Sequence, residues 1–557
     1  MGKFHELLRE LLIKRGIKTE AEADIFLNPD YERDMHDPFL MRDMEKACTR
    51  IMHAINANEK VVVYADYDAD GIPGAVIIHD FFEKIGFKNF EIYIPSRNAE
   101  GYGLNIEAIE EFKDKDVNLI ITIDLGTTAI EEIDLANSYG IDVIVTDHHL
   151  PHEKLPKAFA ILNPKTDEYP ESMLCGAGVV FKLVQGLVPG RWTSGSLDVQ
   201  RPGTPEGWEK WLLDMAGLAT LSDMVPLTGE NRAIAYFGLM VLRKSPRPGL
   251  QKLLSIMKID QKYLNEDDVG FMLTPRINAA SRMDDPMRAY ELLASKDDKK
   301  AVGLAEHLTK INDERKHTVL SIMKEVKHSF EKRELGDVVV IGNPKWKVGV
   351  LGLVAGKVMD EYDKPVFVWA KDENDVIKGS CRSPGSVSVV ELMSQSTEYF
   401  INYGGHELAG GFSVHTNKIH FLEESLNESF HKVKKPSEGS EINFDLKLDL
   451  NMVTMKNWKE IGKMAPFGLG NPKPVFLFEK VKITKARQFG KNNSGEHLSI
   501  TVVNEQGKEV EAISFFSNPE SFKADISQGA HVDLYATFDL SRFRGREELR
   551  LRIVDIV

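Results

Sequence analysis

Short apolar runs alternate with helix-like segments through the first half of the chain. The apolar runs are rich in Val and Ile and cover residues 61–65, 90–94, 117–123 and 142–146. The segments between them place apolar residues at helical spacing over residues 74–85, 105–113 and 129–139. Strands that alternate with helices predict a parallel sheet covered by helices. We therefore predict an α/β domain over residues 41–295, preceded by an N-terminal extension at residues 1–40.

The pattern changes in the second half of the chain. Residues 296–333 contain no proline and carry apolar residues at helical spacing, which predicts one long connecting helix. A second α/β unit is expected over residues 334–436. Beyond it, apolar and polar residues alternate in five runs, at 475–489, 497–503, 509–516, 531–540 and 549–557. Such runs predict a small antiparallel barrel of the OB type over residues 437–557.

Composition and charge exclude some classes of protein. The chain has no run of 18 apolar residues, and its N-terminus lacks the apolar core of a signal peptide, so we expect no membrane span and a cytoplasmic location. Its three cysteines are far apart in the sequence, which fits a reducing compartment. A Gly-, Pro- and Ser-rich stretch at residues 189–207 predicts a surface loop insertion. The net charge of −15 argues mildly against a chain coated by nucleic acid, but local charge matters more than the total.

Acidic clusters follow three of the predicted strands. They consist of Asp66, Asp68 and Asp70 in the first, Asp124 in the second, and Asp147 with His148 and His149 in the third. The carboxyl ends of parallel strands share one edge of a sheet, so we expect these side chains to converge. Carboxylates with imidazole suit Mn²⁺ or Mg²⁺, and two such ions can hydrolyse a phosphodiester.

Other interpretations of these motifs are weaker. DYDADG could open a calcium loop, but Ile77 stands where that loop needs a glutamate, and the motif follows a strand. Asp124 or Asp223 alone could be a helix cap. No GxSxG, P-loop or strand-linked GxGxxG is present, which argues against a hydrolase triad, an NTPase and a dinucleotide site.

DYDADG, the isolated Asp124, the DHH tripeptide and LSDMVPL, which contains Asp223, resemble the four motifs of the DHH phosphoesterases. Among these, the chain is most similar to the RecJ group of single-strand-specific 5′→3′ exonucleases. The resemblance implies a site for two Mn²⁺ or Mg²⁺ ions, with ligands drawn from Asp66, Asp68, Asp70, Asp124, Asp147, His148 and Asp223. Asp68 and Asp70 match the superfamily best, and spacing leaves open which of the first three bind. The tripeptide would be catalytic, with His149 as the second-site or transition-state residue.

Basic residues in segments that resemble RecJ motifs are expected to hold the 5′ end or the backbone of the substrate. They are Arg97, Arg276, Arg282 and Arg382, accompanied by Ser380. The guanidinium fork matches phosphate oxygens, although a lone arginine is more often a surface residue. Gly404, Gly405 and His406 resemble the GGH motif of the DHHA1 domain, which would assist substrate binding.

The predicted barrel combines aromatic and basic residues, as single-strand-binding surfaces do. Its basic cluster consists of Arg542, Arg544, Arg546, Arg550 and Arg552, and a simple solvated β surface is the alternative. The sequence departs from the usual RecJ pattern at Leu125, Pro73, Gly74, Lys347 and Ser281, which puts rate and substrate preference in question.

These features together predict a cytoplasmic, monomeric exonuclease acting 5′→3′ on single-stranded DNA in repair and recombination. A single-strand-binding protein and a RecQ-type helicase are the partners that the resemblance suggests. Three alternatives stay open: a DHH phosphodiesterase of short oligonucleotides or cyclic dinucleotides, a manganese-dependent pyrophosphatase, and a non-catalytic single-strand binder.

Overall fold

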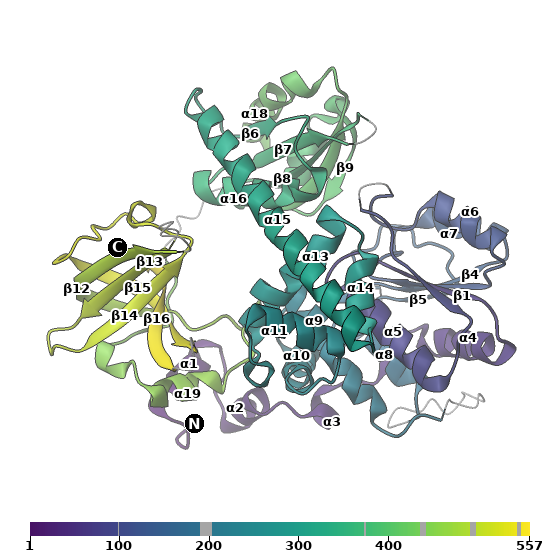
Figure 1. Cartoon of the computed structure of the whole chain (residues 1–557), viewed down its shortest axis with the longest axis horizontal. Coiled ribbons are helices and arrows are strands. Elements are labelled where there is room, and N and C mark those ends of the chain that lie inside the picture. The colour runs from purple at the N-terminus through teal and green to yellow at the C-terminus, as the bar shows by residue number, and fades with distance from the viewer. Residues whose placement is uncertain are drawn as a thin grey trace. The chain divides into compact units, whose positions relative to one another are not determined.

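The computed structural model describes residues 1–97, 100–166, 168–189, 203–372, 375–434, 442–490, 497–542 and 547–557. The chain divides into two compact units, whose elements are labelled in Figure 1. The larger unit contains His36–Val225 and Phe237–Gly439, and the smaller contains Met1–Met35, Pro226–Tyr236 and Ser440–Val557. Most of the predicted loop at 189–207 falls outside the described residues.

A five-stranded parallel sheet forms the first part of the larger unit. Its order is β2 (Phe90–Tyr93), β1 (Val61–Ala65), β3 (Leu119–Ile123), β4 (Asp142–Thr146) and β5 (Ala160–Leu162). Every residue of β1 and β3 is buried, because helices cover both faces, and such strands become continuous runs of Val and Ile. Figure 1 shows α6 (Ile106–Asp114) and α7 (Ile130–Ser138) on one face. The other face carries α4 (Met44–Ala57), α5 (Gly71–Ile85) and α8 (Gly176–Leu187).

A helical region follows the sheet. Its helices are α9 (Leu213–Ser222), α10 (Gly229–Leu242), α11 (Pro248–Met257), α12 (Glu266–Asp268), α13 (Thr274–Met283) and α14 (Met287–Ala294). The predicted connecting helix is α15 (Asp298–Phe330), and the Asp297 side chain accepts the Lys299 and Lys300 N–H groups at its start. Its C-terminal half packs Val319, Ile322 and Val326 into the core of the next domain.

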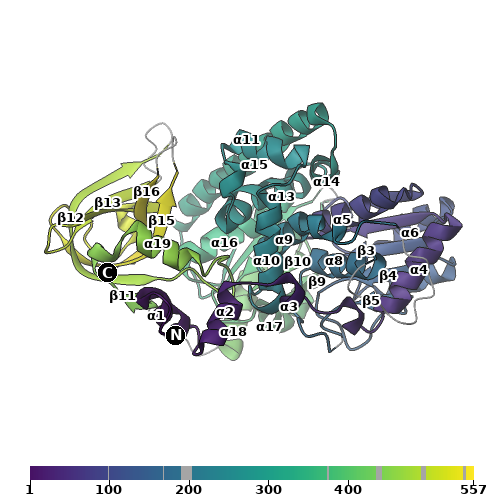
Figure 2. The same ribbon diagram turned by 90° about the horizontal axis from the view of Figure 1, so that it is seen from below.

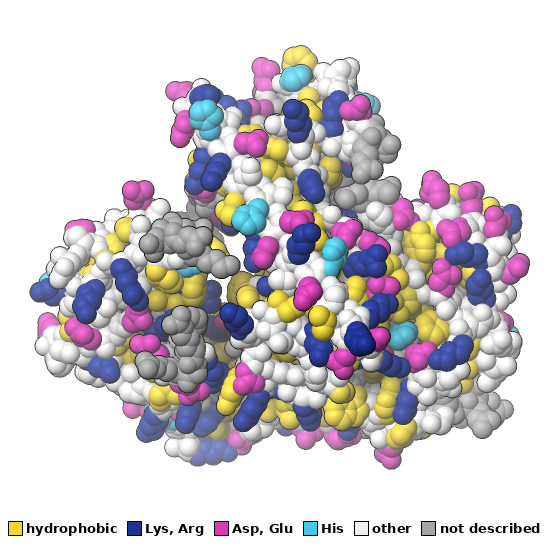
Figure 3. All heavy atoms as spheres, in the orientation of Figure 1, with side chains coloured by type: hydrophobic (Ala, Val, Ile, Leu, Met, Phe, Trp, Pro, Cys, Tyr) yellow, Lys and Arg dark blue, Asp and Glu magenta, His cyan; other side chains and the backbone are white. Residues whose placement is uncertain are grey.

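A second, mixed sheet completes the larger unit. Its order is β6 (Val339–Gly342), β7 (Val366–Lys371), β8 (Ile377–Arg382), β10 (Ala409–Val414) and β9 (Phe400–Gly405). The pair β6 and β7 is parallel and the remaining pairs are antiparallel. Helices α16 (Leu351–Tyr362), α17 (Val389–Ser394) and α18 (Leu422–Val433) belong to this domain. Acidic and basic side chains intermingle on the face shown in Figure 3, so the negative excess does not gather in one patch there.

The smaller unit is a barrel. The strand order is β11 (Leu446–Lys447), β12 (Phe476–Phe489), β13 (His497–Val503), β14 (Glu509–Phe515), β16 (Glu548–Ile556) and β15 (His531–Ser541). An additional pairing of β12 with β15 closes the sheet. Helix α19 (Met455–Gly462) belongs to the same unit. The five predicted strands are therefore present, and the predicted fold class of two α/β domains, a long helix and an OB barrel is confirmed.

The N-terminal segment packs into the barrel's core. It forms three helices, α1 (Glu6–Lys14), α2 (Glu20–Leu27) and α3 (Tyr31–Asp34). The α1 side chains of Leu7, Leu8, Leu11 and Leu12 lie in the same apolar cluster as the barrel strands. Figures 1 and 2 both show α1 beside α19.

Two further observations concern the whole chain. All three cysteines are free and buried. Within the described ranges, no helix has both the length and the hydropathy of a membrane span.

Candidate metal centre

Three aspartates lie in one row at the carboxyl edge of the parallel sheet. The last paired residues of β1, β3 and β4 are in register, and Asp66, Asp124 and Asp147 follow them directly. Each of the three donates its backbone N–H to the carbonyl at the end of the neighbouring strand, at 2.8–3.0 Å. The ladder of the sheet therefore continues for one residue beyond each strand and brings the three carboxylates together.

The loop after β1 is tight. Asp68 accepts the N–H groups of Asp70 and Gly71 at 2.7 and 3.2 Å, which satisfies free donors at the start of α5. A Cβ atom at Gly71 would lie 2.4 Å from the Asp66 carbonyl oxygen. Only glycine permits this approach, so the G of DYDADG sets how closely the acidic loop returns to the strand.

Asp70 is held by the start of helix α8. Its two carboxylate oxygens accept the N–H groups of Gly176 and Ala177 at 2.6 and 2.7 Å. A helix N-terminus suits an anion because its amides point outward unpaired. A Cβ at Gly176 would lie 2.6 Å from the Asp124 Cβ, so this position also requires glycine.

His148 lies among carboxylates from three elements. Its Nε2 is 3.1 Å from Asp124 Oδ1 and 3.7 Å from one oxygen each of Asp70 and Asp223. Asp223 stands at the C-terminal end of α9, so a helix adds the fourth motif to the sheet edge. Burial lowers the pKa of His148 to about 3, which keeps a neutral imidazole with a lone pair available to a metal ion.

Asp147 has a different environment from the other acids. One oxygen accepts the His148 and His149 N–H groups and lies 2.8 Å from His149 Nδ1, and the other accepts the Thr127 N–H. Burial alone would raise the pKa of Asp147, but the hydrogen bonds from His149 and Thr127 outweigh it and hold that pKa well below its usual range. His149 also contacts the Tyr102 hydroxyl, which donates to the Asp124 carbonyl oxygen.

Three sets of side chains have their ligand atoms within 4.8 Å of one another. They are Asp66, Asp68 and Asp124; Asp70, His148 and Asp223; and Asp124, His148 and His149. Asp66 Oδ1 and Asp124 Oδ1 are buried without a hydrogen-bond partner among the described residues. Buried acceptors that are unpaired and surrounded by further carboxylates fit a divalent cation. Asp147 belongs to none of the three sets found in the described part of the chain.

The electrostatics of the cluster also favour cations. Burial, followed by repulsion from neighbouring carboxylates, raises the pKa values of Asp66 and Asp124 well above the usual range. The same two causes raise the pKa of Asp70 to about 6 and that of Asp223 to about 8. A divalent cation would remove this repulsion by neutralising the charge of the carboxylates.

Three predicted substrate arginines lie close to one another. The Arg97 guanidinium is 5.0 Å from the Tyr67 ring, and Arg282 donates to the Gly349 carbonyl oxygen. Burial and the charge of Arg97 lower the pKa of Arg282 to about 9, and burial likewise lowers the pKa of Arg382, with a smaller effect from Arg97. None of the three forms an ion pair with a carboxylate of the described residues. Cations gathered without counter-ions fit an anionic ligand.

The remaining predicted substrate residues lie on other elements. Ser380, like Arg382, is on β8, and both side chains border Gly352 in the first turn of α16. Arg276 is buried on α13, and its Nε has no partner within the described residues. Gly404 and Gly405 are the exposed last residues of β9, and His406 begins the turn to β10, in the second sheet and not at the edge that carries the acids.

The barrel arginines are only partly described. Arg542 pairs with Glu547 at 3.0 Å and Arg550 with Asp539 at 2.7 Å. Arg552 lies 5.5 Å from the Phe515 ring. Arg544 and Arg546 fall outside the described residues. Where the structure describes this cluster, its positive charge is therefore largely balanced by acids.

Comparison with known proteins covers each part of the fold. Family models match the DHH family N-terminal domain at residues 60–216, the DHHA1 domain at 336–432 and the RecJ OB domain at 444–555. The single-stranded-DNA-specific exonuclease RecJ of Haemophilus influenzae is 30% identical over 99% of this chain and 96% of its own. The chain belongs to the RecJ family. RecJ of Bacillus subtilis is 33% identical over 99% of this chain and 67% of its own. The crystal structure of RecJ from Thermus thermophilus in complex with Mn²⁺ shares the fold, with a TM-score of 0.81 and 24% identity, and covers 100% of this chain and 76% of its own.

The departures from the RecJ pattern have structural explanations at several positions. Pro73 lies in the first turn of α5, where its missing N–H costs nothing. A Cβ at Gly74 would lie 2.6 Å from the Ile123 side chain, so glycine here lets α5 pack closely on β3. Leu125 is buried in the apolar core, and the Ser281 hydroxyl donates to the Asn278 carbonyl oxygen. Lys347 precedes the helical turn before α16, and nothing in the structure explains its replacement of a histidine.

Several residues of this RecJ-family site were missed by the sequence analysis. Lys165 donates to the His148 carbonyl oxygen, and Tyr102 and Thr127 contact the DHH segment. Gly176 and Ala177 hold Asp70. They act mainly through backbone atoms or as single polar residues in loops, so no spacing pattern identifies them.

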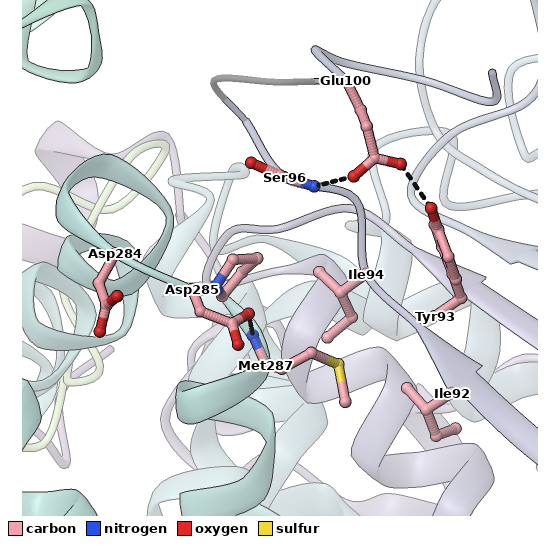
Figure 4. Close-up of a pocket in the computed structure, with 9 residues that line it drawn as sticks. Ile92, Tyr93, Ile94, Ser96, Glu100, Asp284, Asp285 and Met287 are labelled. Carbon is pink, nitrogen blue, oxygen red and sulfur yellow. Dashed lines mark hydrogen bonds between the residues drawn. The ribbon is translucent and has the colours of Figure 1, made fainter. Parts of the chain in front are cut away.

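One cavity of the larger unit has a charge that does not suit a nucleic-acid substrate. It has a volume of about 510 Å³ and lies between β2, the loop after it, and the connection from α13 to α14. Figure 4 shows that the acids Glu100, Asp284 and Asp285 are among its lining residues, and no Lys or Arg is among the described residues that line it. A cavity with this charge disfavours a phosphate-bearing ligand.

Proposed function

We propose that this chain is a metal-dependent exonuclease that degrades single-stranded DNA in the 5′→3′ direction during repair and recombination. Its RecJ-family membership supports an exonuclease specific for single-stranded DNA. The observation that carries the mechanism is the convergence of three sets of metal-ligand atoms at one sheet edge. The 5′→3′ direction rests on the three clustered arginines described above.

The ligand sets divide the residues between two cation positions. Asp66 and Asp68 would hold one ion, and Asp70, Asp223 and His148 the other, with Asp124 beside both positions. Mn²⁺ and Mg²⁺ both suit carboxylate and imidazole ligands, and a RecJ structure of the same fold is a Mn²⁺ complex. When bound, such a pair activates water for attack and neutralises charge on the phosphoryl oxygens.

Asp147 would position His149, and His149 would assist by contacting the substrate. Because the Asp147 oxygens already accept hydrogen bonds, we infer that Asp147 orients His149 instead of binding metal. Its contact with Nδ1 favours a proton on that nitrogen and leaves Nε2, 3.3 Å from the Tyr102 hydroxyl, as the acceptor nitrogen. His149 can then contact a phosphoryl oxygen of the substrate.

The three clustered arginines would hold phosphates next to the scissile bond. Arg97, Arg282 and Arg382 form no ion pair with a described carboxylate, and Arg282 lies near Asp68 of the acidic cluster. A terminal 5′ phosphate carries more negative charge than an internal one and would be favoured there. This arrangement supports degradation from the 5′ end.

Digestion of labelled oligonucleotides tests the proposal. Single strands labelled at the 5′ or the 3′ end, as DNA and as RNA, are incubated with Mn²⁺, with Mg²⁺ or with EDTA. We expect immediate release of labelled mononucleotide only from 5′-labelled DNA, and none in EDTA. Release from the 3′ end, internal cleavage or activity in EDTA would contradict the proposal.

The other candidate functions receive less support. A phosphodiesterase of dinucleotides or a pyrophosphatase needs no OB barrel, and the barrel of this chain matches the RecJ OB domain. A non-catalytic binder would not need the complete set of acidic ligands. A monomer in the cytoplasm that acts beside a single-strand-binding protein and a RecQ-type helicase remains part of this proposal.

A further inference from the structure

The two edges of the parallel sheet differ in how their backbone groups are satisfied. At the β5 edge, the Ile161 N–H points away from the sheet and donates to the Asp43 side chain at 3.0 Å. At the β2 edge, the Asn89 carbonyl oxygen accepts the Val61 N–H of β1 at 3.0 Å. Backbone groups alternate in direction along a strand, so those of Ile92 point away from β1. No described residue hydrogen-bonds to them, and an open edge of this kind can pair with another strand.

The cavity of about 510 Å³ lies at this open edge, as Figure 4 shows. On one side it is bordered by β2 and the loop that follows it, including Ile92 and Ile94. On the other side it is bordered by the connection from α13 to α14, with Met287 as its apolar residue. The volume lies in the range of ligand-binding pockets. We call this space, between Ile92–Glu100 and Asp284–Met287, the edge groove.

The charge of the edge groove is negative. Glu100, Asp284 and Asp285 line it, and all three are exposed. Glu100 and Asp285 accept hydrogen bonds from backbone, hydroxyl and amide groups, which are neutral. Asp284 lies 2.6 Å from His307 Nε2. Within the ranges that the structure describes, none of the three carboxylates pairs with Lys or Arg, so the groove favours a cationic ligand.

Backbone and charge together select the kind of ligand. The acids repel a nucleic acid or an acidic peptide. A polyamine matches the acids, but its protonated amines are donors only and would leave the Ile92 N–H unpaired. A second copy of this chain could offer its own β2, which contains Glu91 and no Lys or Arg. An extended peptide with basic side chains supplies both the carbonyl acceptors and the positive charge.

We propose that the edge groove binds an extended segment of a partner protein, which adds a strand beside β2 and places a lysine or arginine among Glu100, Asp284 and Asp285. Backbone hydrogen bonds to the edge provide affinity, and the acids select the side chain. The inference goes beyond the proposed exonuclease activity and does not depend on it. None of the candidate metal ligands or substrate arginines is among the described residues that line the groove.

The test measures fluorescence anisotropy of labelled peptides with the full chain. In three peptides of equal length, valine alternates with lysine, with serine or with glutamate. We expect the lysine peptide to bind saturably and most tightly, and the glutamate peptide to bind least, because only charge differs along the series. Hydrogen exchange of the Ile92 amide should slow when the lysine peptide is bound, since this N–H then donates to the peptide.

N-methylated peptides test strand pairing without any change to the protein. One version of the lysine peptide is methylated at every valine N–H, and the other at every lysine N–H. The two sets of N–H groups face opposite sides of an extended chain, so only one set faces β2. One version should therefore bind at least about 10-fold more weakly than the parent peptide, and the other should retain its affinity.

Substitutions at the edge and at the acids test the two contributions separately. Ile92→Pro removes the outward N–H and leaves the pairing with β1 intact, whereas Ile92→Ala removes the same side chain and keeps the N–H. The proline variant should bind the lysine peptide at least about 10-fold more weakly than the alanine variant. Asp285→Asn keeps an acceptor for the Met287 N–H and should weaken the lysine peptide by about 2- to 5-fold, with the serine peptide unchanged. Thermal unfolding establishes that each variant is folded, and the N-methylated pair decides the question if Ile92→Pro is not.

Several results would overturn this docking site. They are no saturable binding of the lysine peptide, equal binding of the lysine and glutamate peptides, or equal affinity of the two N-methylated peptides. Spermidine that binds with a dependence on Asp285, while the peptides do not bind, would assign the groove to a polyamine. A dimer of the parent chain that Ile92→Pro dissociates in size-exclusion chromatography would assign the edge to a second copy of this chain.

Discussion

At the scale of residues, the site shows how environment separates chemically identical side chains. Asp124 and Asp147 follow neighbouring strands in the same register and are equally buried. Asp124 Oδ1 has no hydrogen-bond partner among the described residues, whereas both oxygens of Asp147 accept hydrogen bonds. We therefore infer that the first carboxylate is available to a cation and that the second orients His149.

Paired substitutions test whether Asp124 and Asp147 have these different roles. Asp124→Asn should abolish tight Mn²⁺ binding, because it removes a carboxylate that two ligand sets share. Asp147→Asn should weaken Mn²⁺ binding and turnover by only about 10- to 100-fold, as expected for a residue that positions others. Electron paramagnetic resonance of free Mn²⁺ and single-turnover hydrolysis provide the two readouts. Equal loss of Mn²⁺ binding in both variants would show that Asp147 is a ligand, as the sequence motif predicts.

The repulsion among the carboxylates gives a second prediction at this scale. In EDTA, Asp124→Asn should unfold at a higher temperature than the parent, by the equivalent of about 1–3 kcal/mol, because one buried charge is removed. Mn²⁺ at 100 times its dissociation constant should stabilise the parent by about 2.7 kcal/mol and the variant much less. Thermal unfolding with EDTA and with Mn²⁺ measures both effects. A variant that is destabilised in EDTA would mean that Asp124 makes stabilising contacts without metal.

At the scale of elements, helix α1 belongs to the barrel although more than 400 residues of sequence lie between them. Its leucines repeat at helical spacing and fill one end of the barrel core. Arg232, in a third stretch of the sequence, donates to the carbonyl oxygens of Phe26, Met464 and Ala465 and so joins the pieces of the smaller unit.

Two substitutions on α1 test its contribution. Leu11 is fully buried, so Leu11→Ala should destabilise the smaller unit by about 2–5 kcal/mol through lost burial and a cavity. Ile13→Ala on the same helix is the matched control, because Ile13 is 48% exposed, and should change stability by less than about 0.5 kcal/mol. Hydrogen exchange should show faster opening of β13 in Leu11→Ala and no change in β3. Equal exchange of β13 in both variants would contradict the packing of α1 in this core.

At the scale of the whole molecule, two units are assembled from interleaved stretches of one chain. Every candidate metal ligand lies between residues 66 and 223, in the larger unit. The smaller unit takes its core from both ends of the chain. Removal of the barrel is therefore not a cut at a single boundary.

Two truncated chains test whether helix α1 depends on the barrel. A chain of residues 1–439 leaves the buried leucines of α1 without their partners and should aggregate, because it exposes a contiguous apolar face. A chain of residues 36–439 lacks that face, and should remain soluble and bind Mn²⁺ like the full chain. Size-exclusion chromatography and Mn²⁺ titration distinguish the two. A monodisperse 1–439 chain would show that α1 does not depend on the barrel.

The sequence by itself determined the features that depend on local pattern. Alternating strands and helices predicted the parallel sheet, and the positions of the acids after the strands predicted their convergence, because register places strand ends together. The RecJ family and the fold class are confirmed. The assignment of individual ligands stays a prediction, although the structure brings the proposed acids and His148 together.

Only the tertiary structure decided which side-chain atoms are free to bind a metal ion or the substrate. Hydrogen bonds from distant backbone groups occupy Asp147 and position Asp70, and burial beside Arg97 sets the charge environment of Arg282. The packing of α1 in the barrel is likewise absent from any periodicity of the sequence. Sequence pattern reports which face of an element is apolar, whereas hydrogen-bond partners and burial depend on contacts between segments far apart in the chain.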